Sequence, residues 1–206
     1  MAKNKSKIEI SLTDFVDFVC KSGSTKLTKV KQIKSRGEYS PATDFYRGLR
    51  NGIVELHENN KDKKALKSII TIGLDPKKQK NYLDAINGYK TFWGKKIITW
   101  FYPPSNYWVI GDLGIKVNPE LGLIFGGLKY VVKLYLKSDK LTKERVTQIL
   151  TLMEKQLRKE VEVNTKFAVL DVKSGKIFIK EDNDITLTPL LEGEAKSFET
   201  IWNGLK

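Results

Sequence analysis

The chain has little of what most catalytic and metal centres need. Its 206 residues include one cysteine, Cys20, and one histidine, His57. A single cysteine excludes an internal disulfide and is compatible with a reducing compartment. With one residue of each kind, a tetrahedral zinc site of cysteine and histidine ligands within one chain is also excluded. A nucleophile–base pair of Cys20 and His57 is conceivable, but an inert half-buried thiol and a histidine near a helix C-terminus are the ordinary interpretations.

Two further absences limit the function classes. No run of residues approaches the roughly 18 apolar positions of a membrane span, and no apolar segment of a secretory signal follows residues 1–7. The patterns GxxxxGKS/T, GxGxxG and GxSxG do not occur, which argues against nucleotide-dependent catalysis by a known loop type. We therefore expect a cytoplasmic protein with no membrane partner, no cofactor and no bound metal.

What the chain does have is positive charge, most of it in one half. Residues 1–100 contain 21 Lys and Arg against 10 Asp and Glu, whereas residues 101–206 contain 16 against 14. Almost all the basic residues are lysines, and an AT-rich coding bias would explain that preference. Such a bias does not explain why the surplus lies in one half. A surplus confined to one half indicates a contact surface for a polyanion.

The basic half has the apolar periodicity of helices, and the later half has short apolar runs separated by turn residues, as in strands. Capping residues and apolar spacing predict five helices, which start near Ser11, Thr25, Pro41, Asp62 and Pro76. Within residues 97–137, five short aromatic and branched runs alternate with proline and glycine turns. A helix over about 142–159, a hairpin over 166–180 and a last helix follow. The sequence predicts an α+β fold: a helical N-terminal half, then an antiparallel β-meander sheet with helices packed on one face.

These patterns divide the chain near Gly94-Lys95. Residues 1–94 form the basic helical region, in which residues 11–58 resemble a three-helix, helix-turn-helix-like unit followed by two more helices. Residues 95–206 form the α+β domain. Because the boundary has no linker composition, a single core shared by both halves is the alternative.

The basic helical segment is the main candidate for a nucleic-acid interface. No acidic residue lies between Asp17 and Glu38, and Arg47 and Arg50 follow one helical turn apart. The predicted contacts to phosphates or base edges are Lys26, Lys29, Lys31, Lys34, Arg36, Thr43, Arg47 and Arg50. A solvated helix face is the usual meaning of such a charge run, and residues 37–40 are longer than the tight turn before a recognition helix.

Aromatic residues concentrate just after the basic helices. Eight of the 21 aromatic residues lie within residues 89–108. Most are expected in the core, because residues 97–102 are apolar on both faces of a strand. Tyr102 and Tyr107, beside a Pro-Pro turn, are the two expected to be exposed. Exposed aromatics next to a basic surface can stack single-stranded bases.

A weaker pattern points to metal-dependent nuclease chemistry. Asp171-Val172-Lys173 ends an apolar strand, where alternation puts both charged side chains on one face to hold Mg²⁺ and polarise a phosphate. The first carboxylate of such a site has no suitable position, since Asp112 and Glu120 are far upstream while Glu160 and Glu162 are close. The polar end of a hairpin is the commoner meaning of this pattern.

Together these features favour a non-enzymatic nucleic-acid-binding or nucleic-acid-associated protein, with DNA and RNA both open. A protein–protein adaptor that binds an acidic partner is the alternative. A metal-dependent nuclease or hydrolase with carboxylates in the C-terminal half ranks third.

Overall fold

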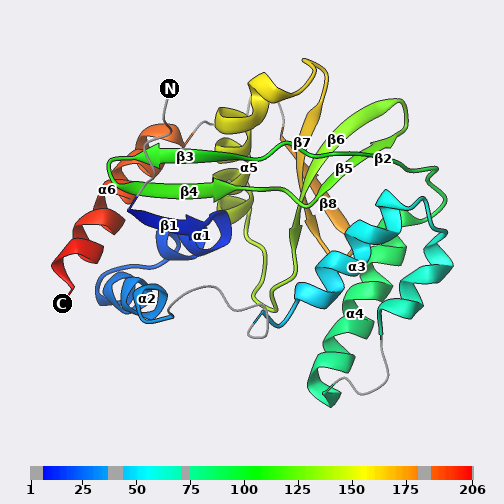
Figure 1. Cartoon of the computed structure of the whole chain (residues 1–206), viewed down its shortest axis with the longest axis horizontal. Coiled ribbons are helices and arrows are strands. Elements are labelled where there is room, and N and C mark those ends of the chain that lie inside the picture. Colours follow the sequence, from blue (N-terminus) through cyan, green and yellow to red (C-terminus); the bar gives the residue numbers. More distant parts are fainter. Residues whose placement is uncertain (1–6, 37–43, 71–74, 181–186, 206) are drawn as a thin grey trace.

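The computed structural model of the chain describes residues 7–36, 44–70, 75–180 and 187–205. This part has an α+β fold, so the predicted class is confirmed (Figure 1). The helices are α1 (Leu12–Val19), α2 (Ser24–Lys34), α3 (Arg47–Glu58), the 3-10 helix η1 (Lys63–Ile69), α4 (Pro76–Trp93), α5 (Lys143–Leu157), the 3-10 helix η2 (Arg158–Glu160) and α6 (Thr188–Gly204). The strands are β1 (Ile8–Ser11), β2 (Thr99–Phe101), β3 (Asn106–Ile110), β4 (Leu113–Val117), β5 (Leu121–Phe125), β6 (Leu128–Tyr135), β7 (Lys166–Asp171) and β8 (Lys176–Ile179).

The strands form two mixed sheets, where the sequence predicts one antiparallel sheet. Their orders are β1-β4-β3 and β2-β5-β6-β7-β8. The predicted antiparallel pairing occurs at β2–β5, β3–β4, β5–β6 and β7–β8, whereas β1–β4 and β6–β7 are parallel. Parallel neighbours need a long crossover, and α5 supplies it between β6 and β7. Strand β1 is absent from the sequence prediction, because its four residues are too few for a periodicity signal.

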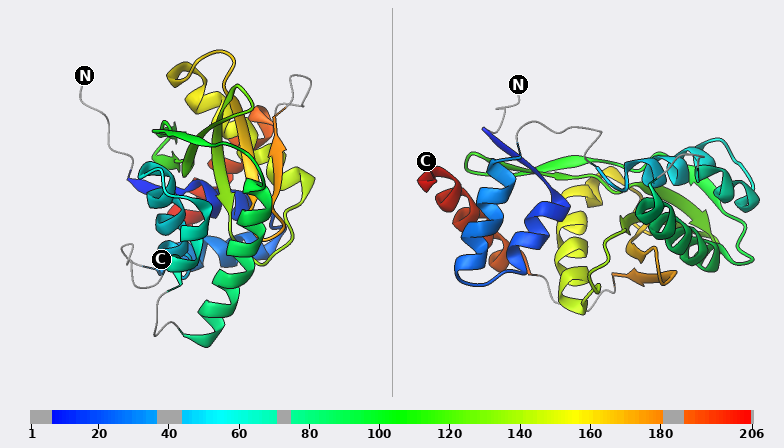
Figure 2. Two further views of the ribbon diagram at one scale, coloured as in Figure 1. Left: turned by 90° about the vertical axis from the view of Figure 1, so that its right-hand side faces the viewer. Right: turned by 90° about the horizontal axis from the view of Figure 1, so that it is seen from below.

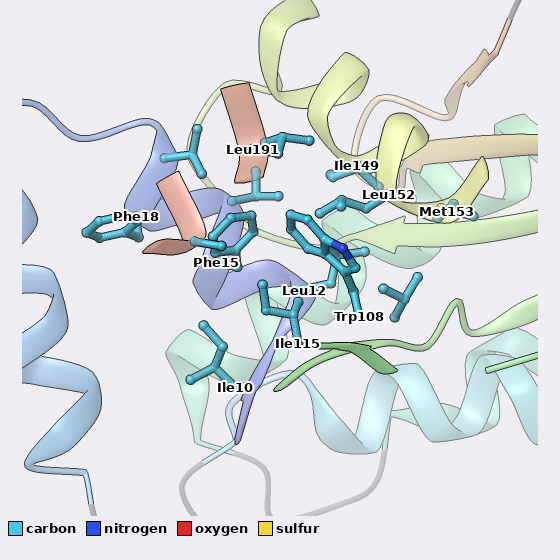
Figure 3. Packing of buried hydrophobic residues seen from close by; sticks show 14 of the residues in the cluster. Ile10, Leu12, Phe15, Phe18, Trp108, Ile115, Ile149, Leu152, Met153 and Leu191 are labelled. Carbon is cyan, nitrogen blue, oxygen red and sulfur yellow. The ribbon is translucent and has the colours of Figure 1, made fainter. Parts of the chain in front are cut away.

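Two hydrophobic cores lie on opposite faces of the five-stranded sheet. Val131 of β6 belongs to the first core and the next residue, Val132, to the second. The first core joins these strands to α1, α2, α5, α6 and the three-stranded sheet (Figure 3), and the second joins them to α3, η1 and α4. Helices therefore cover both faces of this sheet rather than one. The reason is that β6 is apolar on both sides, as in strands buried on both faces.

Each hydrophobic core contains residues from both sides of position 94. Leu49, Ile53 and Leu56 of α3 pack in the second core, whereas α1 and α2 pack in the first. The right-hand view of Figure 2 shows α1, α2 and α6 at one end of an elongated molecule and α3 and α4 at the other. Helix α1 packs against α2, α5, α6, β1 and β4. The three-helix unit over 11–58 stays a prediction, and its described helices pack in two different cores.

The helix starts predicted at Ser11 and at Asp75-Pro76 are confirmed, whereas α1 ends at Val19 ahead of the predicted stop at Gly23, and α3 begins at Arg47. The hydroxyl of Ser11 accepts a hydrogen bond from the amide of Asp14 at the start of α1, as a capping residue does. Asp75 caps α4 ahead of Pro76 in the same way, and Gly94, with φ of +52°, follows its last turn. The start predicted at Pro41 lies outside the described residues. The helix predicted over 62–72 is the 3-10 helix η1.

Helix α4 rests directly on the turn between β7 and β8. A Cβ atom at Gly88 would lie 2.2 Å from the carbonyl oxygens of Val172 and Lys173, so only glycine allows this approach. The contact holds α4, and with it the basic segment before it, against the sheet. No helix in the described ranges combines the length and apolar character needed to cross a membrane.

Candidate nucleic-acid interface

The cations of α2 are largely used to hold the fold together. Lys26 pairs with Glu194 of α6 across the first core. The ammonium of Lys34 donates hydrogen bonds to the carbonyl oxygens of Trp202 (3.0 Å) and Leu205 (2.6 Å), at the C-terminal end of α6. A cation there complements the helix dipole. Of the predicted lysines on α2, Lys31 is the one that remains exposed with no contact shown in the described part of the chain.

Two further predicted cations surround the carboxylates of α1. Arg36 donates to both oxygens of Asp14, at 2.9 and 3.1 Å, and Lys29 bridges Asp14 and Asp17. Burial raises the pKa of Asp14, but the hydrogen bonds and charge of Arg36 and the charge of Lys29 outweigh it and lower the pKa overall. These pairs fix α2 on α1, so their charges are partly neutralised within the protein.

The three residues predicted on the third helix lie apart from this cluster. Arg50 pairs with Asp44 at 2.8 Å, just before α3. Arg47 is exposed at the first position of α3, and Thr43 lies outside the described residues. Because α3 packs in the second core, Arg47 belongs to a surface that the α2 lysines do not share.

A second basic surface lies on η1 and the start of α4, two elements that pack with α3 around the second core. We call it the η1–α4 surface. It comprises Lys63, Lys64, Lys67, Lys77 and Lys80, all exposed. None of these lysines forms an ion pair within the described ranges. The neighbouring acids Asp62 and Asp75 instead accept hydrogen bonds from backbone amides as helix caps. η1 and α4 are in contact, and Lys63 donates to the carbonyl oxygen of Gly94 at 2.7 Å, after the last turn of α4. These lysines therefore lie on two neighbouring elements, with positive charge that no acid neutralises within the described ranges. They are missing from the set predicted from the sequence, because acids interrupt this stretch and the longer acid-free run is the stronger pattern.

The aromatic cluster divides as the sequence predicts. Tyr89, Phe92, Trp93 and Trp108 are buried, and Trp100 and Phe101 are half-buried. Tyr102 is 77% exposed and Tyr107 39% exposed. The hydroxyl of Tyr102 hydrogen-bonds the carboxylate of Glu58 at the end of α3. Tyr107 lies on β3 of the other sheet.

Asp171 and Lys173 do not converge on a shared site. The Asp171 carboxylate accepts a hydrogen bond from the hydroxyl of Ser174 at 2.7 Å. Lys173 instead reaches the side-chain oxygen of Asn81 on α4, at 3.1 Å. The strand ends at Asp171, and the turn that follows breaks the alternation expected to put both on one face. Among the described residues, no three His, Cys, Asp or Glu side chains lie close enough to hold a metal ion.

The structure instead pairs a carboxylate and a lysine that no sequence motif connects. The ammonium of Lys133, on β6, donates to Glu120 at 2.6 Å and to the carbonyl oxygen of Asn118 at 3.1 Å. The other Glu120 oxygen accepts from the amide of Leu134 at 2.8 Å. In an acid-x-lysine motif, the acid lies two residues before the lysine on the same face of the strand. Here that position is Val131, so Lys133 is not part of such a motif. The sequence gives no signal for this pair, because a lysine inside the apolar run 130–136 is the pattern of a strand with one solvated face.

Cys20 follows α1 at the border of the first core, whereas His57 packs on Tyr89 and Trp93 of the second, so they do not form a catalytic pair. Cys20 is exposed, with its sulfur 3.5 Å from the side-chain oxygen of Gln148. His57 is buried, stacks on Trp93 at 4.5 Å between ring centroids, and shares a hydrogen bond of 2.6 Å with the hydroxyl of Tyr89. Both contacts anchor the end of α3 to α4.

The buried histidine predicts a loss of stability in mild acid. Burial lowers the pKa of His57 to about 4, against 6.5 for an ordinary histidine. Between these pH values the unfolded chain binds a proton that the folded chain does not, so the free energy of unfolding should fall as the pH drops from 6.5 toward 4. The expected loss is on the order of 3 kcal/mol. Urea unfolding across this range should show the slope. A His57→Gln variant, less stable at neutral pH, should show a smaller slope, and an equal slope would assign the effect to other groups.

Comparison with known proteins gives a structural similarity and no match of sequence. No family model matches the chain, and neither does any curated protein. The crystal structure of a "putative exonuclease" from Eubacterium rectale is similar, with a TM-score of 0.52 and 14% sequence identity, over 99% of this chain and 86% of that one. At this identity, the similarity shows a shared fold alone.

Proposed function

We propose that this protein binds nucleic acid without cleaving it, using the η1–α4 surface to contact phosphates. The observation that carries the proposal is the absence of ion pairs to the lysines of that surface within the described structure. Lysine ammonium groups that no acid neutralises attract phosphate without reading sequence. Residues 44–96 contain 12 Lys and Arg against 6 Asp and Glu. The structurally similar protein is named a "putative exonuclease", and an exonuclease acts on nucleic acid, which agrees with a nucleic-acid partner.

The non-enzymatic part of the proposal is supported by Glu120 and Lys133. A nuclease of the acid-x-lysine kind needs a carboxylate free to hold a metal ion and a lysine free to act on the phosphate. Here the two groups are buried and bonded to each other, with 11% and 9% of their side chains exposed. The Glu120 carboxylate and the Lys133 ammonium group therefore neutralise each other, and neither is free to bind a metal ion or a phosphate.

The test is fluorescence anisotropy of labelled duplex DNA, single-stranded DNA and RNA against the protein over a salt series. Changing Lys64, Lys67, Lys77 and Lys80 to glutamate should weaken binding by at least about tenfold. The log–log salt slope should shrink by about one for each phosphate that the variant no longer neutralises. A control variant with the same change in net charge converts four exposed lysines elsewhere: Lys21, Lys31, Lys140 and Lys143.

Several outcomes would count against the proposal. Equally weakened binding in both variants would mean a response to net charge and not to this surface. Weakened binding in the control alone would place the interface outside the η1–α4 surface. If the native protein binds none of these nucleic acids at low salt, an acidic protein is the better partner. Cleavage with Mg²⁺ or Mn²⁺ that Asp171→Ala abolishes would establish the nuclease instead.

A further inference from the structure

An open cavity of about 610 Å³ lies beside β2, at the edge of the five-stranded sheet. Its wall includes Phe101, Tyr102, Lys129, Lys159, Glu162 and Thr165. These residues come from the end of β2, the start of β6, η2 and the segment between η2 and β7. The cavity is large enough for a nucleobase and combines two aromatic rings with two cations.

Tyr102 presents a fixed ring at the mouth of this cavity. Its side chain is 77% exposed, yet its hydroxyl is bonded to Glu58 and its ring lies 6.1 Å from that of Trp100. Contacts at the edge and hydroxyl of a ring leave a face open, and little side-chain freedom is lost when a base stacks there. Phe101 lies deeper, with the ammonium of Lys129 6.0 Å from its ring centroid.

The charges of the cavity suit a base better than a phosphate. Lys129 pairs with Glu162, and Glu160 lies beside Lys159, so the lining has as many acids as cations. Thr165 contributes a buried hydroxyl with no hydrogen-bond partner in the described part of the chain. A hydroxyl of this kind is costly unless something satisfies it. Because the charges of the lining balance, the groups that attract phosphates are expected outside the cavity.

The lysines of η1 follow, along the chain, the residue that holds Tyr102. Tyr102 is bonded to Glu58, the last residue of α3, and β2 is in contact with α3. Lys63 and Lys64 of η1 follow within six residues of Glu58. A strand whose base entered the cavity would therefore have its neighbouring phosphates close to these lysines.

We propose that the cavity takes an unstacked base of single-stranded nucleic acid, with Tyr102 as the stacking platform and the η1 lysines on the adjacent phosphates. This inference rests on the proposed function and adds to it a preference for single strands. Base–aromatic stacking tolerates any base, because every base has a π-face. A duplex cannot use the cavity, since its bases are stacked and paired.

The experiment compares labelled single-stranded and blunt duplex DNA in anisotropy titrations with three tyrosine variants. Tyr102→Ala should weaken single-strand binding about 5- to 150-fold and leave duplex binding unchanged. Tyr102→Phe, which keeps the ring and removes the hydrogen bond to Glu58, should stay within about threefold of the native protein. Tyr107→Ala, which removes an exposed tyrosine from the other sheet, is the matched control and should have no effect.

The results separate failure of this inference from failure of the proposed function. If Tyr102→Ala binds single strands like the native protein while the η1–α4 variant still binds more weakly, the cavity is not a base site and the nucleic-acid proposal stands. An equal weakening on single strands and duplex would make Tyr102 a general contact and overturn the single-strand preference. If the native protein binds neither, both proposals fail.

Discussion

Replacing Asp17 by alanine is expected to lower the free energy of unfolding by about 3–5 kcal/mol, the loss typical of removing one partner of a buried ion pair. Asp17 is 7% exposed and accepts hydrogen bonds from Lys29 (3.2 Å), Arg145 (2.5 Å) and Lys137. Burial raises the pKa of Asp17, but the hydrogen bond and charge of Lys137 together with Lys29 and Arg145 lower it overall. Without the carboxylate, three cations would face one another between α1, α2 and α5.

Urea unfolding of the Asp17→Ala protein measures this loss as a lower midpoint at an unchanged m-value. Asp84→Ala is the control, because Asp84 is an exposed carboxylate on α4 with no contact shown in the described ranges; its effect should stay within about 0.5 kcal/mol. Since the folded pKa of Asp17 is lowered, its contribution is present above about pH 4 and is lost as the pH falls through the folded value. A midpoint for Asp17→Ala equal to that of the control would show that the cluster does not stabilise the fold.

The buried pair of Glu120 and Lys133 should show a different pattern, in which the double change is milder than the single change at Lys133. Lys133→Met leaves the Glu120 carboxylate buried with no cation, at a cost of about 3–5 kcal/mol. Glu120→Gln/Lys133→Met removes both charges while the glutamine oxygen can still accept from the amide of Leu134. Replacing a buried pair by groups of similar volume is often neutral, so the double variant should lie within about 1 kcal/mol of the native protein.

The pH dependence of the single variant identifies the cause. A carboxylate left buried without its cation has a raised pKa, so Lys133→Met should lose less stability at about pH 5 than at about pH 8 relative to the native protein. The double variant, with no buried charge at this place, should show no such dependence. A double variant as unstable as Lys133→Met would mean that packing of the lysine stem, and not the charge pair, accounts for the loss.

The sequence is most informative where a signal is local. The hydroxyl of Ser11 and the Asp75-Pro76 step each act within one helical turn, and both start helices where expected. Strands β5 to β8 also follow from their turn residues, since a turn such as Ser174-Gly175 needs only its own backbone geometry. For the same reason Tyr102, after a strand and before two prolines, is at the surface as predicted.

The sequence is least informative about the partners of charged side chains. Lys26 and Glu194 are 168 positions apart, and no periodicity relates α2 to the end of α6. Lys133 interrupts an apolar alternation, a pattern that predicts a solvated strand face, yet the strand is buried on both sides. Glu120 lies far upstream of the acid-x-lysine pattern, and the antiparallel pairing of β5 and β6 brings it to Lys133 instead.

By itself, the sequence determined the α+β class, the positions of most helices and strands, and a surplus of positive charge in the first half, because composition and local patterns encode these properties. The tertiary structure alone decided which cations are neutralised. The cations of α2 pair with carboxylates of α1 and α6, whereas the lysines of the η1–α4 surface stay exposed without an ion pair in the described ranges. The physical reason is that an ion pair depends on distance in space, which the folding of both halves around two shared cores sets.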